Sequence, residues 1–161
     1  PLYFITVCSF RRGRFLACDP VAEILVDAWQ QSARIHGWQI GCYVIMPDHA
    51  HFFCAPTQER KSLSEFMRDW KKWTARRVRE CLDCSRGRLT TAPDRDPLKG
   101  GRQVIAAAKI WQAEFFDHLL RSDESYHQKW EYVRMNPVRT GLANKPDEWR
   151  YQGEIESLTW R

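Results

Sequence analysis

The sequence predicts one α+β domain of the ferredoxin-like, split βαβ type, in which a single antiparallel sheet has helices packed mainly on one face. Three observations support this fold class. The chain has 161 residues, the usual length of one domain, and we assign 1–161 to a single domain. Hydrophobic residues make up 43% of it, which is enough for a core. Strand-like and helix-like segments follow one another in the order β-α-β-β-α-β-α.

The first half of the chain supplies the β-α-β-β part of that order. Residues 2–10 are rich in β-branched and aromatic side chains, as strands are. An Asp-Pro pair opens the segment 19–36, in which apolar residues recur every three to four positions, the period of a helix. Residues 38–45 and 49–55 again have the composition of strands, and the short break at 46–48 predicts that these two strands pair antiparallel.

The second half predicts a helix, a strand and a further helix. Residues 62–80 open with a capping-box pattern and continue with an apolar stripe. Residues 83–102 show no period, so we expect an extended loop there. Residues 109–120 predict a strand, and 122–135 predict a helix that an Asn-Pro pair ends. The tail, 143–161, is short and less regular.

Positive charge is concentrated in one of the predicted helices. Residues 60–80 contain eight basic and three acidic residues and so carry the whole formal net charge of +5. A basic helix on an otherwise neutral body is typical of a protein that contacts a polyanion such as nucleic acid. The alternative is a solvated helix face without a partner. Eight Trp and eight Phe are many for this length, and they suit stacking on bases as well as a core.

Cysteine usage and hydropathy indicate the cellular setting. The six cysteines are scattered through apolar segments, and a chain of this length does not need disulfides, so we expect reduced thiols in a cytoplasmic protein. Cys81 and Cys84 have the spacing of half a zinc site, but no second pair follows at zinc-finger spacing. No run approaches the roughly 18 apolar residues that span a bilayer, so we expect no membrane partner.

His49 and His51 are the first candidates for chemistry. They are two apart in a predicted strand, which places both imidazoles on one face with Cα atoms about 6–7 Å apart. Both rings can then reach one metal ion and leave coordination positions for phosphate, water and a further ligand. The alternative is a pair of half-buried strand histidines without a metal, because an HxH pair also arises by chance.

Three strings, in order along the chain, resemble one family. The first, Met-Pro-Asp-His-Ala-His-Phe at 46–52, is similar to the signature of the HUH endonuclease superfamily. The second is Trp-Gln-Ala-Glu-Phe-Phe-Asp-His at 111–118. The third, at 130–142, contains Tyr-x-x-x-Asn-Pro followed by Gly-Leu. Over roughly residues 3–142 the chain therefore resembles the single-tyrosine, IS200-like transposases of that superfamily, and most of all the REP-associated tyrosine transposases.

The resemblance implies a role for each matched residue. His49, His51 and Asn136 match metal ligands, and Tyr132 matches the nucleophile. Thr140 stands where Ala is common in the family, a departure that we expect to be neutral. Elementary chemistry agrees, because a helix makes neighbours of positions four apart, and a carboxamide oxygen suits Mg²⁺ or Mn²⁺. A phenol is a weak nucleophile at neutral pH and needs such a metal to polarise the phosphate.

The implied reaction is attack of Tyr132 on a phosphodiester of single-stranded or hairpin DNA, which gives a 5′-phosphotyrosine and a free 3′ hydroxyl. The family includes monomers and homodimers, and the sequence leaves both open. Basic side chains of the charged helix and beside the predicted nucleophile are the expected DNA contacts. They are Arg68, Lys71, Lys72, Arg76, Arg79, Arg134 and Arg139.

Three alternatives stay open at this point. Tyr126 could be the nucleophile, although it lies on another face of the helix from Tyr132 and has no family match. The protein could bind folded single strands without cutting them. It could also be a hydrolase that activates water at the histidine pair, but the nearest carboxylate, Asp48, is expected on the opposite strand face from His49.

Overall fold

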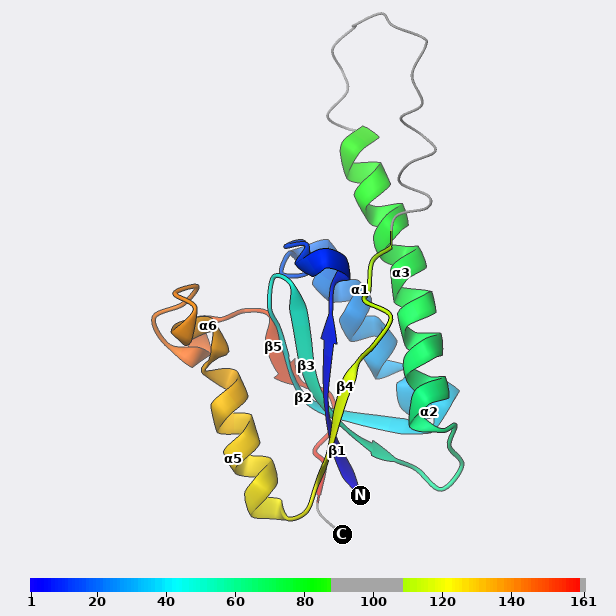
Figure 1. Cartoon of the computed structure of the whole chain (residues 1–161), viewed down its shortest axis with the longest axis vertical. Helices are drawn as coiled ribbons and strands as arrows, with labels where there is room; N and C mark the ends of the chain where they lie inside the picture. The colour runs from blue at the N-terminus through cyan, green and yellow to red at the C-terminus, as the bar shows by residue number, and fades with distance from the viewer. Residues whose placement is uncertain (88–108, 160–161) are drawn as a thin grey trace, which may run out of the picture.

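A computed structural model describes residues 1–87 and 109–159. Its centre is a five-stranded antiparallel sheet in the order β4-β1-β3-β2-β5 (Figure 1). The first four strands have the order of the ferredoxin-like sheet, so the predicted α+β class is confirmed. The strands are β1 (Leu2–Cys8), β2 (Trp38–Ile45), β3 (His49–Pro56), β4 (Phe116–Leu120) and β5 (Gln152–Glu154). The helices are α1 (Asp19–Gln30), α2 (Ser32–His36), α3 (Leu63–Gly87), α5 (Asp123–Arg134) and α6 (Asn136–Arg139), with 3₁₀ turns η1 (Phe10–Arg12) and η2 (Pro146–Glu148).

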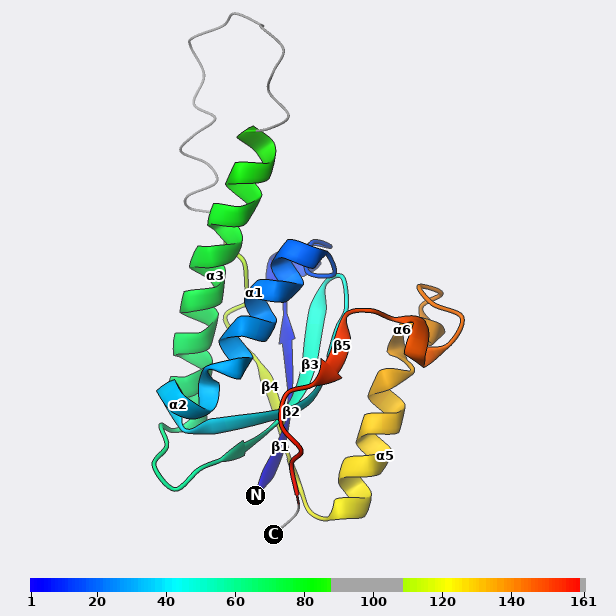
Figure 2. The same ribbon diagram turned by 180° about the vertical axis from the view of Figure 1, so that it is seen from behind.

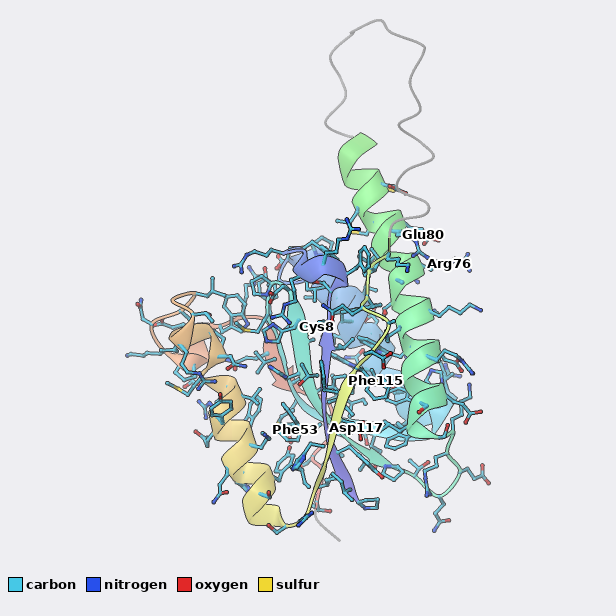
Figure 3. The ribbon with its side chains drawn as sticks, viewed as in Figure 1. Cys8, Phe53, Arg76, Glu80, Phe115 and Asp117 are labelled. Atoms are coloured by element: carbon cyan, nitrogen blue, oxygen red, sulfur yellow. The ribbon has the colours of Figure 1, made fainter. Side chains whose placement is uncertain are left out.

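Different helices cover the two faces of the sheet. α1, α2 and α3 lie on one side, and α5 with α6 lies on the other (Figures 1 and 2). On the first side, Trp29 of α1 stacks on Trp70 of α3 with ring centroids 5.6 Å apart, and both rings contact Phe52 of β3. On the second side lies Phe53 of β3 (Figure 3). Tyr126 of α5 packs against it, with ring centroids 4.6 Å apart. Most helical residues lie on one face, as expected, and α5 adds a second core layer on the other.

The register of β1 and β3 places the end of one strand beside the start of the other. Cys8 is opposite His49, and Thr6 is opposite His51. Alternation along β3 sends both histidines to the side of α5, whereas Phe52 points toward α1 and α3. The candidate site therefore lies on the α5 face, at the end of the sheet where β1 stops and β3 begins.

The basic helix is longer than the sequence indicated. α3 continues to Gly87, so the expectation of a loop over 83–102 is wrong for its first five residues. The reason is that the apolar stripe of the helix continues past Val78 to Leu82, which packs against the core. The remainder of the predicted loop lies outside the described residues.

Both edge strands also differ from the prediction. Of the predicted strand 109–120, only Phe116–Leu120 pairs as a strand, because Lys71 of α3 binds backbone carbonyls just before it. In the irregular tail, Gln152–Glu154 adds a fifth strand beside β2. Three residues that include a glycine have little strand propensity of their own, so this pairing depends on the sheet already being there.

Features that bear on the cellular setting have clear places in the fold. None of the six cysteines, all of which lie in the described residues, forms a disulfide; Cys81 is partly buried on α3 and Cys84 is exposed. In the described part of the chain, no group of three or more His, Cys, Asp or Glu side chains could hold a metal ion. Within these residues, the structure therefore adds no zinc ligands to Cys81 and Cys84. No helix within the same residues is long and apolar enough to cross a membrane.

Candidate functional site

The two histidines of the HxH pair lie side by side at the start of β3. Their ring centroids are 4.7 Å apart, and the ring planes are nearly perpendicular, at 79°. His51 stacks on Phe4 of β1 with centroids 5.2 Å apart. The structure thus brings together the two imidazoles that the strand period placed on one face.

Each imidazole is held through its Nδ1 atom. His49 Nδ1 lies 2.7 Å from Oδ1 of Asp48. His51 Nδ1 lies 2.8 Å from Oγ1 of Thr6, its neighbour on β1. With the proton on Nδ1, both rings donate to oxygen and keep the Nε2 lone pair for another group, which is how proteins orient histidines that bind metals.

The expectation that Asp48 points away from His49 is wrong. Asp48 lies in the bend before β3, where the alternation of a strand does not apply, and its carboxylate turns back to the imidazole. Burial alone would raise the pKa of Asp48, but the hydrogen bond from His49 and the nearby Arg12 guanidinium lower it below its usual value. Asp48 is therefore ionised and already engaged on two sides.

Arg12 of η1 is the second of these partners. Its Nε donates to Asp48 Oδ2 at 3.0 Å, and its Nη1 donates to Sγ of Cys8 at 2.8 Å. Cys8 is buried at the end of β1 (Figure 3). Arg11 and Arg12 both have left-handed backbone, with φ of 53° and 57°, which costs a residue other than glycine about 1–2 kcal/mol. The fold accepts this strain at the turn that delivers Arg12 to the site.

Both histidines favour the neutral form. Burial lowers the pKa of His49, although the Asp48 carboxylate opposes the shift. Burial, together with the charges of His49 and Lys129, lowers the pKa of His51 to about 3. A metal ligand must be a neutral imidazole, so these environments favour metal binding over protonation near pH 7.

Tyr132 and Asn136 lie at the junction of α5 and α6. α5 ends at Arg134 and α6 begins at Asn136, so the expectation that one continuous helix carries both residues is wrong. Pro137 has no N–H to donate back to α5, and it is tolerated only because it stands in the first turn of a new helix.

Arg139 holds the two residues together across this break. Its guanidinium lies over the Tyr132 ring, 4.1 Å from the centroid. Its Nη2 donates to the backbone carbonyl of Tyr132 at 2.7 Å and also to Oδ1 of Asn136. Tyr132 is 63% exposed, so its side chain is open to solvent. Arg139, an expected DNA contact, is thus engaged with both Tyr132 and Asn136.

Lys129 connects the α5 side to the histidines. Its Nζ lies 5.0 Å from the centroid of Phe4, the ring on which His51 stacks. The positive charges of Lys129 and Arg139 both act on His51. The tyrosine-bearing helices and the histidine pair therefore share one side of the sheet.

The donor set on this side suits a hard divalent cation. It consists of the two free Nε2 positions of His49 and His51 and the amide oxygen of Asn136, which are groups that Mn²⁺ and Mg²⁺ accept. Oδ1 of Asn136 already accepts a hydrogen bond from Arg139, but a carbonyl oxygen has a second lone pair for a metal.

Tyr126, the competing nucleophile, belongs to the core. It is only 7% exposed, and its ring packs against Phe53. Burial raises the pKa of Tyr126, and its hydroxyl is hydrogen-bonded to Cys42. A buried phenol with a structural partner is unsuited to attack on a DNA phosphate.

The basic residues of α3 have different surroundings. Nζ of Lys71 donates to the carbonyls of Gln112 and Ala113, the latter at 2.7 Å, and burial lowers its pKa. Lys71 is thus occupied within the fold. Arg68 forms an ion pair with Asp69 of α3 at 3.1 Å. Arg76 pairs with Glu80 of the same helix at 3.2 Å (Figure 3). Such exposed pairs are worth little and can be exchanged for phosphates.

The remaining predicted DNA contacts lie apart from these. Lys72 and Arg79 line a groove between α3 and residues 109–114. Arg134 is bound by two carboxylates, at 3.2 and 2.7 Å, so a DNA contact there would have to displace them.

The structure also brings side chains to the site that sequence reasoning did not identify, namely Thr6, Arg12 and Lys129. Thr6 depends on the pairing of β1 with β3, and Arg12 depends on a left-handed turn, so neither has a local signal. Lys129 does have a local signal in the sequence. It precedes Tyr132 by three positions, so the two residues lie on the same side of one helix.

Comparison with known proteins identifies the family. A family model described as Transposase IS200 like matches residues 2–92. A REP-associated tyrosine transposase of Escherichia coli is 22% identical over 149 residues, which cover 92% of this chain and 73% of the relative. A Haemophilus influenzae protein whose name places it in the same group is 23% identical over 151 residues, covering 93% of this chain and 77% of its own.

A solved structure shares the fold. The structure of a REP-associated tyrosine transposase bound to a REP hairpin matches with a TM-score of 0.64 at 23% identity, covering 94% of this chain and 74% of that one. This likeness shows the fold, whereas the family model spans more than half of the sequence. The chain belongs to the IS200-like transposase family.

Proposed function

We propose that this protein cuts and rejoins single-stranded or hairpin DNA through a covalent bond between Tyr132 and a 5′ phosphate, with Mg²⁺ or Mn²⁺ held by His49, His51 and Asn136. One observation carries the proposal. The two imidazoles of the HxH pair are fixed through Nδ1, have free Nε2 positions, and lie on the side of the sheet that bears Tyr132. Membership of the IS200-like family supports it.

The residues of the chain would divide the chemistry as follows. Oη of Tyr132 attacks the phosphorus, the bond to the 3′ oxygen breaks, and the phenolic proton passes through water to that oxygen. Arg139 holds the tyrosine ring and the Asn136 amide in place. A bound divalent ion would polarise the phosphate oxygens and offset their charge in the transition state. A 3′ hydroxyl of another end reverses the reaction, and the ester conserves the energy of the broken bond.

The relatives support the choice of substrate. The Escherichia coli relative is named a REP-associated tyrosine transposase, and the matching solved structure holds a REP hairpin. The alternative of a hydrolase at the histidine pair is less well supported, because Asp48 is bonded to His49 and Arg12 and is not free to activate water.

The test is a denaturing gel with the purified protein and labelled hairpin oligonucleotides taken from sequence flanking the gene, with Mg²⁺ or Mn²⁺. We expect a slowly migrating protein–DNA adduct that requires the metal and is absent in Tyr132→Phe. Tyr126→Phe is the matched control, since it removes a phenol from the same helix and should keep the adduct.

A second candidate is a protein that binds hairpins without cutting them. The observation in its favour is that Oδ1 of Asn136 already accepts a hydrogen bond from Arg139, which leaves it one lone pair for a metal. Tight binding of the same hairpins with no adduct in any metal would support this candidate and contradict the covalent mechanism.

A further inference from the structure

A basic groove with an aromatic wall lies on the α3 side of η1, away from Tyr132. It runs between α3 and residues 109–114 and has a volume of about 660 Å³. Its cationic lining residues besides the occupied Lys71 are Arg11, Lys72, Arg79 and Lys109, and its aromatic lining residues are Phe10 and Trp111. Glu114 is the acidic residue of the lining. The groove therefore combines positive charge with apolar ring surface.

The wall opposite α3 is held firmly in place. Trp111 is buried, and its Nε1 donates to the Oγ1 of Thr74 on α3 at 2.9 Å. The backbone of this segment is tied to β1 and η1, since Phe10 N donates to Ile110 O at 2.7 Å and Gln112 N donates to Cys8 O at 3.0 Å. A groove whose walls are already ordered can bind a flexible ligand without losing conformational entropy of its own.

Phe10 lies under two cations. The Arg11 guanidinium lies 5.2 Å and the Lys109 ammonium 5.6 Å from the ring centroid. The ring therefore holds these two positive charges in the groove, where they suit the phosphates of a single-stranded nucleic acid. Lys72 and Lys109 are exposed and can reach such phosphates.

η1 connects this groove to the histidine pair. Arg11 lines the groove, whereas the next residue, Arg12, binds Asp48, the partner of His49. Both arginines have left-handed backbone, an arrangement that sends consecutive side chains to different sites at a cost in strain. A strand that leaves the histidine pair over η1 would enter the groove directly.

We infer that this groove binds the single-stranded segment of the DNA that continues from the phosphate at the histidine pair, through contacts to its phosphates and without sequence readout. The inference rests on the proposed function for the identity of the ligand as DNA. It assigns a ligand site to Arg11 and Lys109, and it separates Lys72 and Arg79, which line the groove, from Arg68 and Arg76, which do not.

The test measures binding in a Tyr132→Phe background without metal, so that chemistry plays no part. Fluorescence anisotropy compares a blunt hairpin with the same hairpin carrying a single-stranded extension, for Lys72→Glu/Lys109→Glu and for the matched control Arg68→Glu/Arg76→Glu. Both pairs reverse two exposed charges. Thermal unfolding of each variant confirms that it is folded.

We expect the extension to strengthen binding of the parent protein, and the groove variant to lose about tenfold in affinity for the extended hairpin with little change for the blunt one. Its salt slope for the extended hairpin should fall by about 1.4, for two contacts to a single strand. The control variant should affect both hairpins alike. Equal losses for the two hairpins in the groove variant, or no loss, would overturn the inference.

The failure of the groove proposal can be told apart from the failure of the proposed function. An adduct at Tyr132 combined with an unaffected groove variant would reject the groove alone. Loss of extension-dependent binding in a protein that forms no adduct would support the groove and reject the covalent chemistry.

Discussion

His49 is the residue whose geometry depends most on its neighbours. Its Nδ1 atom is bound to Asp48, which in turn is bound to Arg12, so the direction of its free Nε2 is set by two side chains from outside the strand. A carboxylate behind a histidine fixes the tautomer and raises the basicity of the ring toward a metal.

Asp48→Ala should therefore weaken metal binding without removing a ligand. We expect the affinity for Mn²⁺, measured by isothermal titration calorimetry on the DNA-free protein, to fall by about 10- to 100-fold. Asp69→Ala is the control, because Asp69 is also an ion-paired carboxylate but pairs with Lys61 and Arg68 around α3. Equal affinities in Asp48→Ala and the parent would show that Asp48 does not support a metal ligand.

For single residues, the sequence predicts contacts between near neighbours in the chain and misses contacts between distant ones. The period of a strand is enough to place His49 and His51 together, and the structure agrees. The same period gave the wrong direction for the side chain of Asp48, because this residue lies one position before the strand begins. Thr6 is 45 positions from His51, and only the register of β1 against β3 reveals the contact.

Among the elements, the junction between α2 and β2 is the one that tolerates least change. Gly37 ends α2 with a left-handed backbone, φ 72°, and its carbonyl accepts from Thr57 N at 2.8 Å. A Cβ on Gly37 would lie 1.9 Å from the backbone oxygen of Glu59. The turn therefore packs backbone on backbone, and neither side can move away without breaking that contact.

Gly37→Ala should lower the free energy of unfolding by more than about 2 kcal/mol, since it adds a backbone clash to the left-handed strain. Gly141→Ala is the matched control: its φ is 74°, but nothing lies within 4 Å of the added Cβ. We expect about 1–2 kcal/mol there, from strain alone. Urea unfolding of both variants measures the difference, and equal losses would mean that the contact with Glu59 yields easily.

Elements with a strong internal period were predictable, and those that depend on a partner were not. β2, β3 and the start of α3 follow from composition and capping patterns. The helix expected over 122–135 is observed as Asp123–Arg134, but the proline signal that ends it does not show that a second helix begins at Asn136. β5 is stabilised by β2 and has no pattern of its own.

In the whole molecule, the histidine pair and the basic groove lie near the same end of the sheet, on opposite faces. The histidine pair faces α5, the groove opens beside α3, and η1 lies between them. The fold class was predictable because the three inner strands and the long helices α1 and α3 bury apolar residues that recur at the period of their own element. The meeting of η1 with both faces was not, since it requires two consecutive left-handed arginines that no propensity favours.

The stability of the whole molecule should depend on pH through His36, at the contact of α2 with α3. Its ring packs on Phe66 at 5.5 Å, and its Nδ1 is buried without a hydrogen-bond partner among the described residues. Burial, together with the nearby charge of Lys61, lowers the pKa of His36 below its usual value. The unfolded chain therefore binds a proton at a higher pH than the folded chain does.

The sign of the effect follows from this difference. Above about pH 6.5 neither state is protonated at His36, and the stabilisation is complete; as the pH falls below that value, protons bind the unfolded chain first and stability is lost. In metal-free buffer, the free energy of unfolding from urea titrations should decrease from pH 8 to pH 5. The slope should be shallower in His36→Gln, by at most about 1.4 kcal/mol per pH unit for one proton. His118→Gln, on the exposed strand β4, is the control for the replacement of a histidine. If His36→Gln keeps the slope of the parent protein, His36 is protonated in the folded protein as readily as in the unfolded chain, and its burial has no effect on the pH dependence.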